Sequence, residues 1–376
     1  MVLKQISLRN FRNYKKLILE LDERVNVFIG NNAQGKTNLL ESIYFLIITK
    51  SFRNTRNKDL IKIGEKEGEV RGIIKKDNKT LSDELKILIK QESKLININN
   101  KKLPKISEYI SKFNIVSFSP SDLDIIKGFP NIRRKFLNIE LSQLKNKYLL
   151  TLNEYNYLIK TRNEYLKSIN CSNCNYDYLN VINDQVINKA IIIYQHRNQF
   201  INDLNNIINV IYKKIFGNND IYIKYSPSIL IDHYTDSEIK KVLTKKFEEN
   251  IEKEIILGQT LIGPHRDDFS FYISEQEIKS YGSQGQQRVA VLCLKLAVVE
   301  IIKKEKKEWP IILLDDVFSE LDEKIKNNII DYAAKGAQII ITTTDVNNIV
   351  EKIKDAGTIF YVKNAVITRG ADEQNE

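Results

Sequence analysis

The chain has 376 residues, of which 42% are hydrophobic, and its 58 Lys and Arg against 48 Asp and Glu give a net charge of +10. This length suggests about two domains. No stretch approaches the ~20 apolar residues of a membrane span, and residues 1–6 lack the regions of a secretory signal. We therefore expect a cytoplasmic protein. Three cysteines argue against a disulfide scaffold. Cys171 and Cys174 form a single C-x-x-C, and without a second pair we interpret it as an incidental loop pair rather than a metal site. The positive net charge favours an anionic partner.

Residues 30–37 match a phosphate-binding loop. In order they are Gly30, Asn31, Asn32, Ala33, Gln34, Gly35, Lys36 and Thr37. They fit G-x-x-x-x-G-K-[ST] at every fixed position, between an apolar run at 25–29 that predicts a buried strand and helical apolar spacing over 38–46. The glycines allow close approach of an anion, Lys36 would reach the β- and γ-phosphates of ATP, and Thr37 would hold Mg²⁺. An ordinary glycine turn is the alternative, which the complete strand, loop and helix disfavour.

An apolar run at 311–314 ends in two carboxylates, Asp315 and Asp316. Such a run is typical of a central parallel strand buried on both faces. Because neighbouring strand residues face opposite sides, we assign Asp315 to Mg²⁺ and Asp316 to orienting or deprotonating the attacking water. A pair of solvated carboxylates is the alternative. A second apolar run, at 338–341, predicts a neighbouring strand whose polar end could reach the γ-phosphate. The two ends of the chain should therefore fold into one ATPase core, with an insertion between them.

A third motif, at residues 283–287, precedes a helix that we expect over 289–307. Ser283, Gly285 and Gln286 stand at its N-terminus, which is a second place for an anion. One nucleotide does not need two such sites, so we infer that this one serves the nucleotide of a second copy, with two ATPs held between the chains of an isologous dimer. A polar N-cap on a core helix is the alternative, and without the other motifs it would be preferred.

The middle of the chain has a mostly helical pattern from about residue 131 to 253. Helical spacing over 137–155 and 181–215, on either side of a polar loop, predicts an antiparallel helical hairpin in a compact lobe. Outside this lobe, antiparallel strands are expected at 70–74, 85–89 and 95–98, and a closing hairpin at 359–362 and 366–368. Basic clusters in the insertion, at 133–135, 145 with 147, 240–241 and 245–246, are either solvated helix faces or contacts for DNA phosphates.

Together these motifs resemble the ABC-type ATPase heads of chromosome-maintenance proteins. Further blocks at 8–14, 119–123, 128–137, 263–268 and 280–288 resemble the RecF family of bacterial recombination-mediator ATPases, over nearly the whole chain. The resemblance implies an α/β fold, namely a P-loop ABC-type ATPase head, with a mixed sheet, helices and an antiparallel β subdomain, plus an inserted helical lobe. It divides the chain into the N-terminal part of the head (1–128), the lobe (129–254) and the C-terminal part of the head (255–376).

The resemblance also implies a function. It implies an ATP-dependent homodimer that binds double-stranded DNA and gap junctions, assists recombinase loading and has RecR and RecO as partners. It adds Arg12, Asp322 and Thr344 to the nucleotide-contacting residues. Two departures from the wider pattern, Asp316 in place of glutamate and Thr344 or Thr343 in place of a histidine, predict slow, DNA-stimulated hydrolysis.

Three points stay open at this stage. Either Arg53 or Arg56 is a candidate phosphate-sensing arginine, with an ordinary surface arginine as the alternative. Residues 265–267 have no evident physical role. A transporter ATPase subunit is the alternative function, because it would share the nucleotide motifs, although it would not carry a basic helical insertion of this size.

Overall fold

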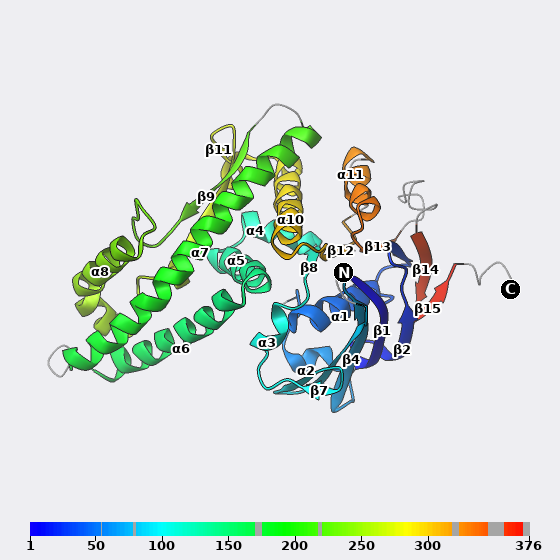
Figure 1. The fold of residues 1–376 in the computed structure, drawn as a ribbon, viewed down its shortest axis with the longest axis horizontal. Helices are drawn as coiled ribbons and strands as arrows, with labels where there is room; N and C mark the ends of the chain where they lie inside the picture. The colour runs from blue at the N-terminus through cyan, green and yellow to red at the C-terminus, as the bar shows by residue number, and fades with distance from the viewer. Residues whose placement is uncertain are drawn as a thin grey trace. The chain divides into compact units, whose positions relative to one another are not determined.

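The structure is a computed structural model, and it describes residues 1–53, 55–77, 80–169, 175–216, 220–317, 323–344 and 357–370. The chain forms two compact units, drawn together in Figure 1. The first unit combines Met1–Asp122 with Val298–Glu376, and the second is Leu123–Ala297. Both ends of the chain thus belong to one unit, as the separation of the phosphate loop from the acidic strand predicts.

The first unit contains a six-stranded sheet of order β15-β14-β3-β13-β12-β8. Its strands are β3 (Val25–Ile29), β8 (Ile115–Phe118), β12 (Ile311–Asp315), β13 (Ile339–Thr343), β14 (Gly357–Lys363) and β15 (Val366–Arg369). Only β15 runs antiparallel to its neighbour. Every residue of β3, β12 and β13 is buried, as expected of apolar runs in a parallel sheet. The carboxyl ends of these strands meet at one edge, where ligands bind in open α/β sheets.

A second sheet in the same unit is antiparallel, with the order β2-β1-β4-β5-β6-β7. Its strands are β1 (Val2–Phe11), β2 (Tyr14–Glu20), β4 (Glu67–Lys75), β5 (Asp83–Lys90), β6 (Lys94–Ile98) and β7 (Lys101–Lys102). The three predicted strands at 70–98 are therefore confirmed, while β1, β2 and β7 were not predicted.

Helix α1 (Lys36–Ile48) follows the phosphate loop and contacts strands of both sheets, which explains why nearly all of its residues are buried. The other helices of the first unit are α2 (Asn57–Leu60), α3 (Ser107–Ile110) and α11 (Glu323–Ala334). Among the described residues, none of the helices combines the length and the hydropathy that a membrane span requires.

The second unit is built on long helices. The long ones are α5 (Pro130–Leu144), α6 (Asn146–Ser168), α7 (Tyr176–Phe216), α8 (Asp236–Leu257) and α10 (Gln284–Lys306), and the residues of α10 from Val298 onward belong to the first unit. Two short helices, α4 (Asp124–Lys127) and α9 (Ile278–Tyr281), and a 3₁₀ turn at Pro264–Arg266 complete the helical part of this unit, which begins at the end of a second 3₁₀ turn, Pro120–Leu123. The helices α6 and α7 lie side by side, as the predicted hairpin requires (Figure 1). The single predicted helix over 137–155 is wrong in one respect: Lys145 has an extended backbone, with φ −134° and ψ 108°, and separates α5 from α6.

The second unit also contains a three-stranded antiparallel sheet, β11-β10-β9, that the helical prediction missed. Its strands are β9 (Ile221–Ser226), β10 (Asp268–Ile273) and β11 (Gln276–Glu277). Because β10 pairs with β9, the chain beyond α8 remains in this unit. The unit therefore begins at Leu123 and ends at Ala297, whereas the predicted lobe covered 129–254. Its assignment as a lobe on an ATPase head stays a prediction.

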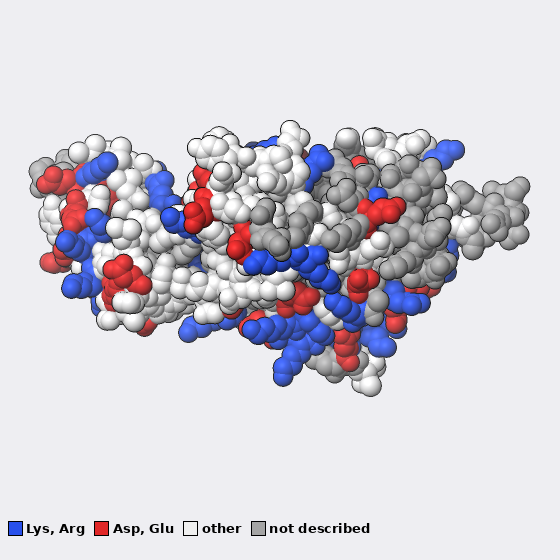
Figure 2. Space-filling view, turned by 90° about the horizontal axis from the view of Figure 1, so that it is seen from above, with Lys and Arg blue, Asp and Glu red and all other residues white. Residues whose placement is uncertain are grey.

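Lys and Arg side chains lie beside Asp and Glu on the face of the molecule that is seen from above in Figure 2. Figure 2 shows this mixture on one face, together with one larger gathering of Lys and Arg near the middle of the view.

Candidate nucleotide-binding site

The phosphate loop joins β3 to α1 at the carboxyl edge of the parallel sheet, and its glycines are required by geometry. Gly35 has φ +116°, a backbone conformation that side chains disfavour. A Cβ at Gly30 would lie 2.3 Å from the carbonyl oxygen of Val362 in β14. Gly30 therefore lets the loop pass close to the neighbouring strand, and Gly35 lets it turn into the helix.

Lys36 is turned onto its own loop. Its Nζ donates to the carbonyl oxygens of Gly30 at 2.5 Å and Asn31 at 3.0 Å. Burial lowers the pKa of Lys36, whereas the charges of Asp316 and Asp315 raise it. The ammonium is thus held at the mouth of the loop, where phosphate oxygens are stronger acceptors than the two carbonyls.

The two aspartates occupy different positions, as the sequence predicts. Burial raises the pKa of Asp315, and hydrogen bonds from Thr342 and Thr37 oppose this effect. The Thr342 hydroxyl donates to Asp315 Oδ1 at 2.9 Å and accepts from the backbone N–H of Asp316 at 3.1 Å. Asp316 has φ +53°, so the chain leaves its strand conformation between the two carboxylates. Thr37 and Asp315 form a pair of hard oxygen donors that fits Mg²⁺.

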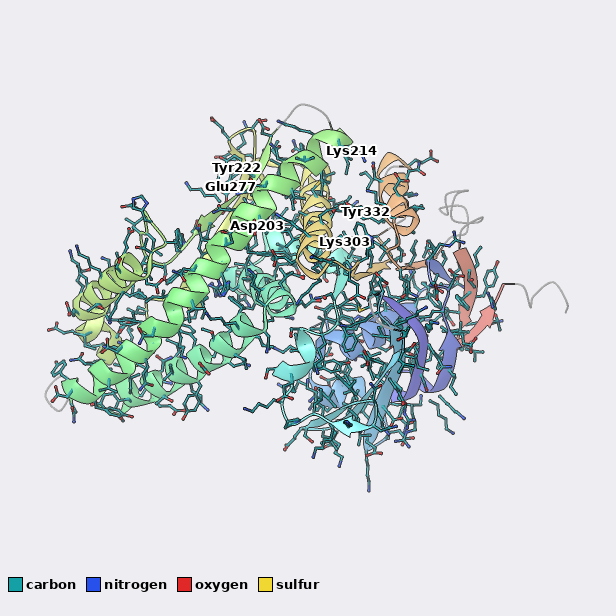
Figure 3. The ribbon with its side chains drawn as sticks, viewed as in Figure 1. Asp203, Lys214, Tyr222, Glu277, Lys303 and Tyr332 are labelled. Carbon is teal, nitrogen blue, oxygen red and sulfur yellow. The ribbon has the colours of Figure 1, made fainter. Side chains whose placement is uncertain are left out.

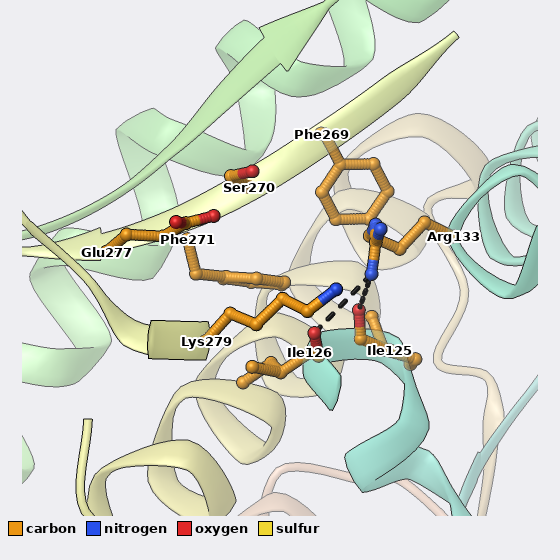
Figure 4. Close-up of a pocket in the computed structure, with 8 residues that line it drawn as sticks. All are labelled: Ile125, Ile126, Arg133, Phe269, Ser270, Phe271, Glu277 and Lys279. Carbon is orange, nitrogen blue, oxygen red and sulfur yellow. Dashed lines mark hydrogen bonds between the residues drawn. The ribbon is translucent and has the colours of Figure 1, made fainter. Parts of the chain in front are cut away.

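Lys36, Thr37 and Asp316 line a cavity of about 320 Å³ in the first unit. It is lined by Asn32, Ala33, Gln34, Gly35, Lys36, Thr37, Asn38, Arg53 and Asp316. The volume falls in the usual range for small-molecule sites, about 300–1,000 Å³. A cavity in the second unit, shown in Figure 4, has about 10 Å³, which holds no more than a water molecule. Of these two cavities, only the first has the size of a nucleotide.

Arg12 and Arg53 converge on one buried carboxylate beside this cavity. Arg12 donates through Nε and Nη2 to the two oxygens of Glu41 at 2.8 Å each, and Glu41 is fully buried. Arg53 Nη1 lies 3.9 Å from Glu41 and donates to Asn38 Oδ1 at 3.0 Å. Arg53 lines the cavity, whereas Arg56 caps α2 through its backbone N–H and Asp59. The structure thus favours Arg53 over Arg56 as the phosphate-sensing candidate. Nucleotide contact by Arg12 stays a prediction.

The loop is braced from two sides by residues that sequence reasoning missed. On one side the Tyr14 hydroxyl donates to the Gly35 carbonyl at 3.1 Å. On the other side the turn between β14 and β15 donates twice to Gln34: Asn364 N–H to Oε1 at 2.6 Å and Ala365 N–H to the carbonyl at 2.9 Å. The turn lies there because β14 runs parallel to β3, so both strands end at the same edge.

Helix α10 begins at Gln284, earlier than the predicted residue 289, because the polar residues before it form a reciprocal cap. The Ser283 hydroxyl accepts from the Gln286 N–H at 3.2 Å, and the Gln286 side chain accepts from the Ser283 N–H at 2.8 Å. Ser283, Gly285 and Gln286 are all exposed. The N-cap interpretation is therefore confirmed, and these residues are also open to a second molecule.

Comparisons with known proteins agree with this site. The RecF/RecN/SMC N terminal domain family matches residues 2–368. The "DNA replication and repair protein RecF" of Bacillus cereus (strain G9842) is 40% identical over 370 residues, covering 97% of this chain and 98% of the relative. The chain belongs to the RecF family. The RecF of Bacillus thuringiensis (strain Al Hakam) has the same identity and coverage. The family excludes the transporter alternative.

Solved structures give the same result. The RecF-ATP structure, described as that of a recombination mediator protein in the RecFOR pathway, has a TM-score of 0.91 and 33% identity, covering 98% of this chain and 97% of that one. The Smc head domain from Pyrococcus furiosus has a TM-score of 0.56 at 14% identity, which supports the ABC-type head fold alone.

Two further RecF-like positions remain predictions. Thr344 follows β13 and is exposed, while Thr343 is buried and accepts from the Gly30 N–H through its carbonyl at 3.3 Å. Asp322 lies outside the described residues, as do Cys171 and Cys174.

The RecF-like block at 263–268 acquires a structural role. Arg197 donates to Asp267 at 2.8 Å, and both side chains are almost fully buried. Asp267 also accepts from the Tyr225 hydroxyl and from the Ser228 N–H at 2.9 Å. His265 Nδ1 lies 2.7 Å from the Tyr155 hydroxyl. These bonds tie the segment to α6, α7 and β9, so the block is part of the polar core of the second unit.

The basic cluster at 133–135 is not a free DNA contact. Arg133 is only 4% exposed and donates to Asp268 Oδ2 at 2.9 Å and to the Gly128 carbonyl at 2.9 Å. Figure 4 shows its guanidinium turned toward α4. Arg134 donates to the backbone of Asp267 at 2.8 Å. The interpretation of Arg133 as a contact for DNA phosphates is therefore wrong, because this buried arginine is bonded to the half-buried carboxylate of Asp268 and to carbonyls at the end of α4.

The clusters on α8 fit the alternative of a solvated helix face. Lys246 and Lys245 lie 2.7 Å and 3.8 Å from Glu249, which offsets part of their charge.

Proposed function

We propose that this protein is an ATP-dependent DNA-binding ATPase of recombinational repair, with ATP and Mg²⁺ at the cavity of the first unit. One observation carries the proposal: Lys36, Thr37 and Asp316, from distant parts of the sequence, line one nucleotide-sized cavity, and the buried Asp315 is hydrogen-bonded to Thr37. The RecF-ATP structure supports ATP as the ligand.

Each site residue would have its own role in ATP binding or hydrolysis. The loop amides and Lys36 bind the phosphates. Thr37 and Asp315 hold Mg²⁺, which would offset phosphate charge when bound. Asp316 orients the attacking water, and Arg53 reports the γ-phosphate to Glu41 and α1. Because Asp316 is one methylene shorter than glutamate, its carboxylate reaches less far and hydrolysis is slow. DNA-stimulated turnover is part of the same proposal.

Dimerisation would complete the site. Ser283, Gly285 and Gln286 are exposed at the N-terminus of a helix of 23 residues, and backbone N–H groups there attract phosphate. ATP would join two copies through this helix end, and hydrolysis would separate them and release DNA. Double-stranded DNA and gap junctions are the proposed substrates. RecR and RecO are the proposed partners, in keeping with the RecFOR pathway that the description of the solved relative mentions.

Binding of a fluorescent DNA duplex, with and without ATP, tests this proposal. The wild type should bind the duplex more tightly when ATP is present. Lys36→Met should lose ATP binding in a direct titration and with it the ATP-dependent gain in DNA affinity. Unchanged nucleotide affinity in this variant, or DNA binding that ignores ATP in the wild type, would refute the proposed function.

A further inference from the structure

A group of lysines in the first unit lies away from the nucleotide cavity and comes from four separate parts of the chain. We define this head basic patch as Lys76, Lys112, Lys303, Lys306, Lys307 and Lys335. Lys76 follows β4, Lys112 follows α3, Lys303 and Lys306 end α10, and Lys335 follows α11.

Contacts place these segments together. Lys76 Nζ donates to the carbonyl of Lys112, and Lys306 Nζ donates to the carbonyl of Ser111 at 3.4 Å. Lys303 lies 4.9 Å from the centre of the Trp309 ring, which packs edge-on against Tyr332 at 5.7 Å. Figure 3 labels Lys303 and Tyr332, the two side chains that meet this tryptophan. Lys335 in turn lies 4.9 Å from the Tyr332 ring.

Aromatic rings hold the lysines in place. Trp309 and Tyr332 are 9% and 7% exposed, and Phe113 is 1% exposed. The Nζ of Lys76 lies 4.9 Å from the centre of the Phe113 ring. The rings are therefore too buried to stack on bases. They instead make cation–π contacts that hold the lysine side chains in place. Less side-chain entropy is therefore lost when the ammonium groups bind an anion.

Nearby carboxylates leave the patch positive. The amino group of Met1 lies 2.9 Å from Asp77 and 3.7 Å from Glu308, which offsets one of these two negative charges and leaves them outnumbered by the six lysines. Burial and then the charge of Lys76 lower the pKa of Lys306, with Glu305 opposing them. The lysine charges therefore repel one another, and an anion placed between them would relieve this repulsion.

We propose that the head basic patch binds the phosphate backbone of DNA without reading its sequence. The patch contains lysines alone, which act as point charges on phosphates rather than as bidentate readers of bases. DNA offers one negative charge per about 1.7 Å of helix axis, which suits several cations on one face. The inference rests on the proposed DNA-binding function and moves the expected contacts from Arg133 and Arg134 to the first unit.

A charge-matched pair of variants tests the proposal. The first, Lys303→Gln, Lys306→Gln and Lys335→Gln, keeps a polar side chain at each position and removes three charges from the patch. The second, Lys240→Gln, Lys241→Gln and Lys245→Gln, removes three charges from α8. Affinity for a random-sequence duplex is measured from 50 to 300 mM salt, and the slope of log K against log salt counts phosphate contacts, about 0.9 per contact.

We expect the patch variant to lower the slope by about 2 to 3 and the α8 variant to leave it near the wild-type value. Both should keep ATP affinity and melting temperature, which shows that they fold. Equal losses in the two variants would mean a general charge effect and would overturn the proposal. So would an unchanged slope in the patch variant, including the case in which it loses binding only to an acidic peptide such as polyglutamate. Failure of the wild type to bind DNA would refute the proposed function instead.

Discussion

At the scale of single residues, the sequence left open whether Arg53 or Arg56 is the phosphate-sensing candidate, and the structure distinguishes the two by their positions. It lines the nucleotide cavity and is tied to α1 through Asn38 and Glu41. The side chain of Arg56 has no place among the residues that line this cavity. The two arginines, three positions apart, therefore lie in different surroundings: one lines the cavity and the other precedes a short helix.

We expect Arg53→Ala to weaken ATP binding about tenfold, the effect of losing one charge-assisted contact of roughly 1.5 kcal/mol. Arg56→Ala is the matched control and should bind ATP normally, because its backbone N–H can still cap α2. Isothermal titration with a non-hydrolysable ATP analogue measures both. Equal affinities in the two variants would remove Arg53 from the site.

At the scale of helices and strands, the sequence predicted the elements whose patterns are local. The buried runs at β3, β12 and β13 were found because apolar residues surrounded by turns have few other interpretations. The loop residues 30–37 and Asp316 could be predicted to lie near one another because the motif spacing and the end of a buried strand place them at the same edge of the sheet. Strand β9 was missed, because its free edge is satisfied by side chains of α7: Asn205 bonds both backbone groups of Ile223, and Asn209 accepts from Ile221. The alternation of buried and exposed residues in β9 is a local signal of a strand that the helical interpretation passed over, whereas the distant side chains that hold its edge leave no local signal.

The bracing of the phosphate loop was missed for the same reason. Two N–H groups from residues 364 and 365 reach Gln34, some 330 positions away in sequence. Both turn residues have positive φ, at 50° and 62°, which directs the N–H groups outward from the hairpin. The nucleotide loop thus depends on a hairpin near the end of the chain.

Gln34→Ala should therefore lower ATP affinity about fivefold, since one hydrogen bond of about 1 kcal/mol that holds the loop is lost. The amides of 364 and 365 should also exchange hydrogen faster in this variant, and ATP should protect them less than in the wild type. Ala365→Gly is the control: it keeps the N–H donor and removes the strain of a positive φ, so affinity should be unchanged. Wild-type exchange in Gln34→Ala would contradict the brace.

The polar core around residues 263–268 has a measurable pH dependence. Burial lowers the pKa of His265 from 6.5 to about 4. Because the folded pKa is the lower one, the unfolded chain takes up the proton first as the pH falls. The stability contribution of neutral His265 is thus complete above pH 6.5 and is lost as the pH falls toward 4.

His265→Gln should remove this dependence. Between pH 7.5 and pH 5, the wild type should lose on the order of 1–2 kcal/mol more unfolding free energy than the variant. Urea unfolding at the two pH values measures the difference. His233→Gln changes an exposed histidine and should follow the wild type. If His265→Gln shows the full wild-type loss, the histidine is not the titrating group.

At the scale of the whole molecule, the nucleotide loop belongs to one compact unit and the exposed residues Ser283 to Gln286 to the other. If a second copy supplies these residues, ATP binding and association are linked equilibria. ATP at 100 times its Kd stabilises a folded monomer by about 2.7 kcal/mol whatever the protein concentration. A dimer that forms only with ATP adds a second term, which grows with protein concentration because association is driven by mass action.

The melting temperature of the wild type with ATP should therefore rise when protein concentration is raised a hundredfold, and without ATP it should stay constant. Ser283→Arg removes the hydroxyl and places a long side chain where the phosphate of the second copy would lie close, so its bulk should block the close approach of the two chains. This variant should keep the ATP-induced rise at low concentration and lose the concentration dependence. Ser280 is a nearby exposed serine outside the helix cap, so the variant Ser280→Arg serves as the control for the added arginine. A concentration-dependent melting temperature in Ser283→Arg would mean that the dimer forms through another surface.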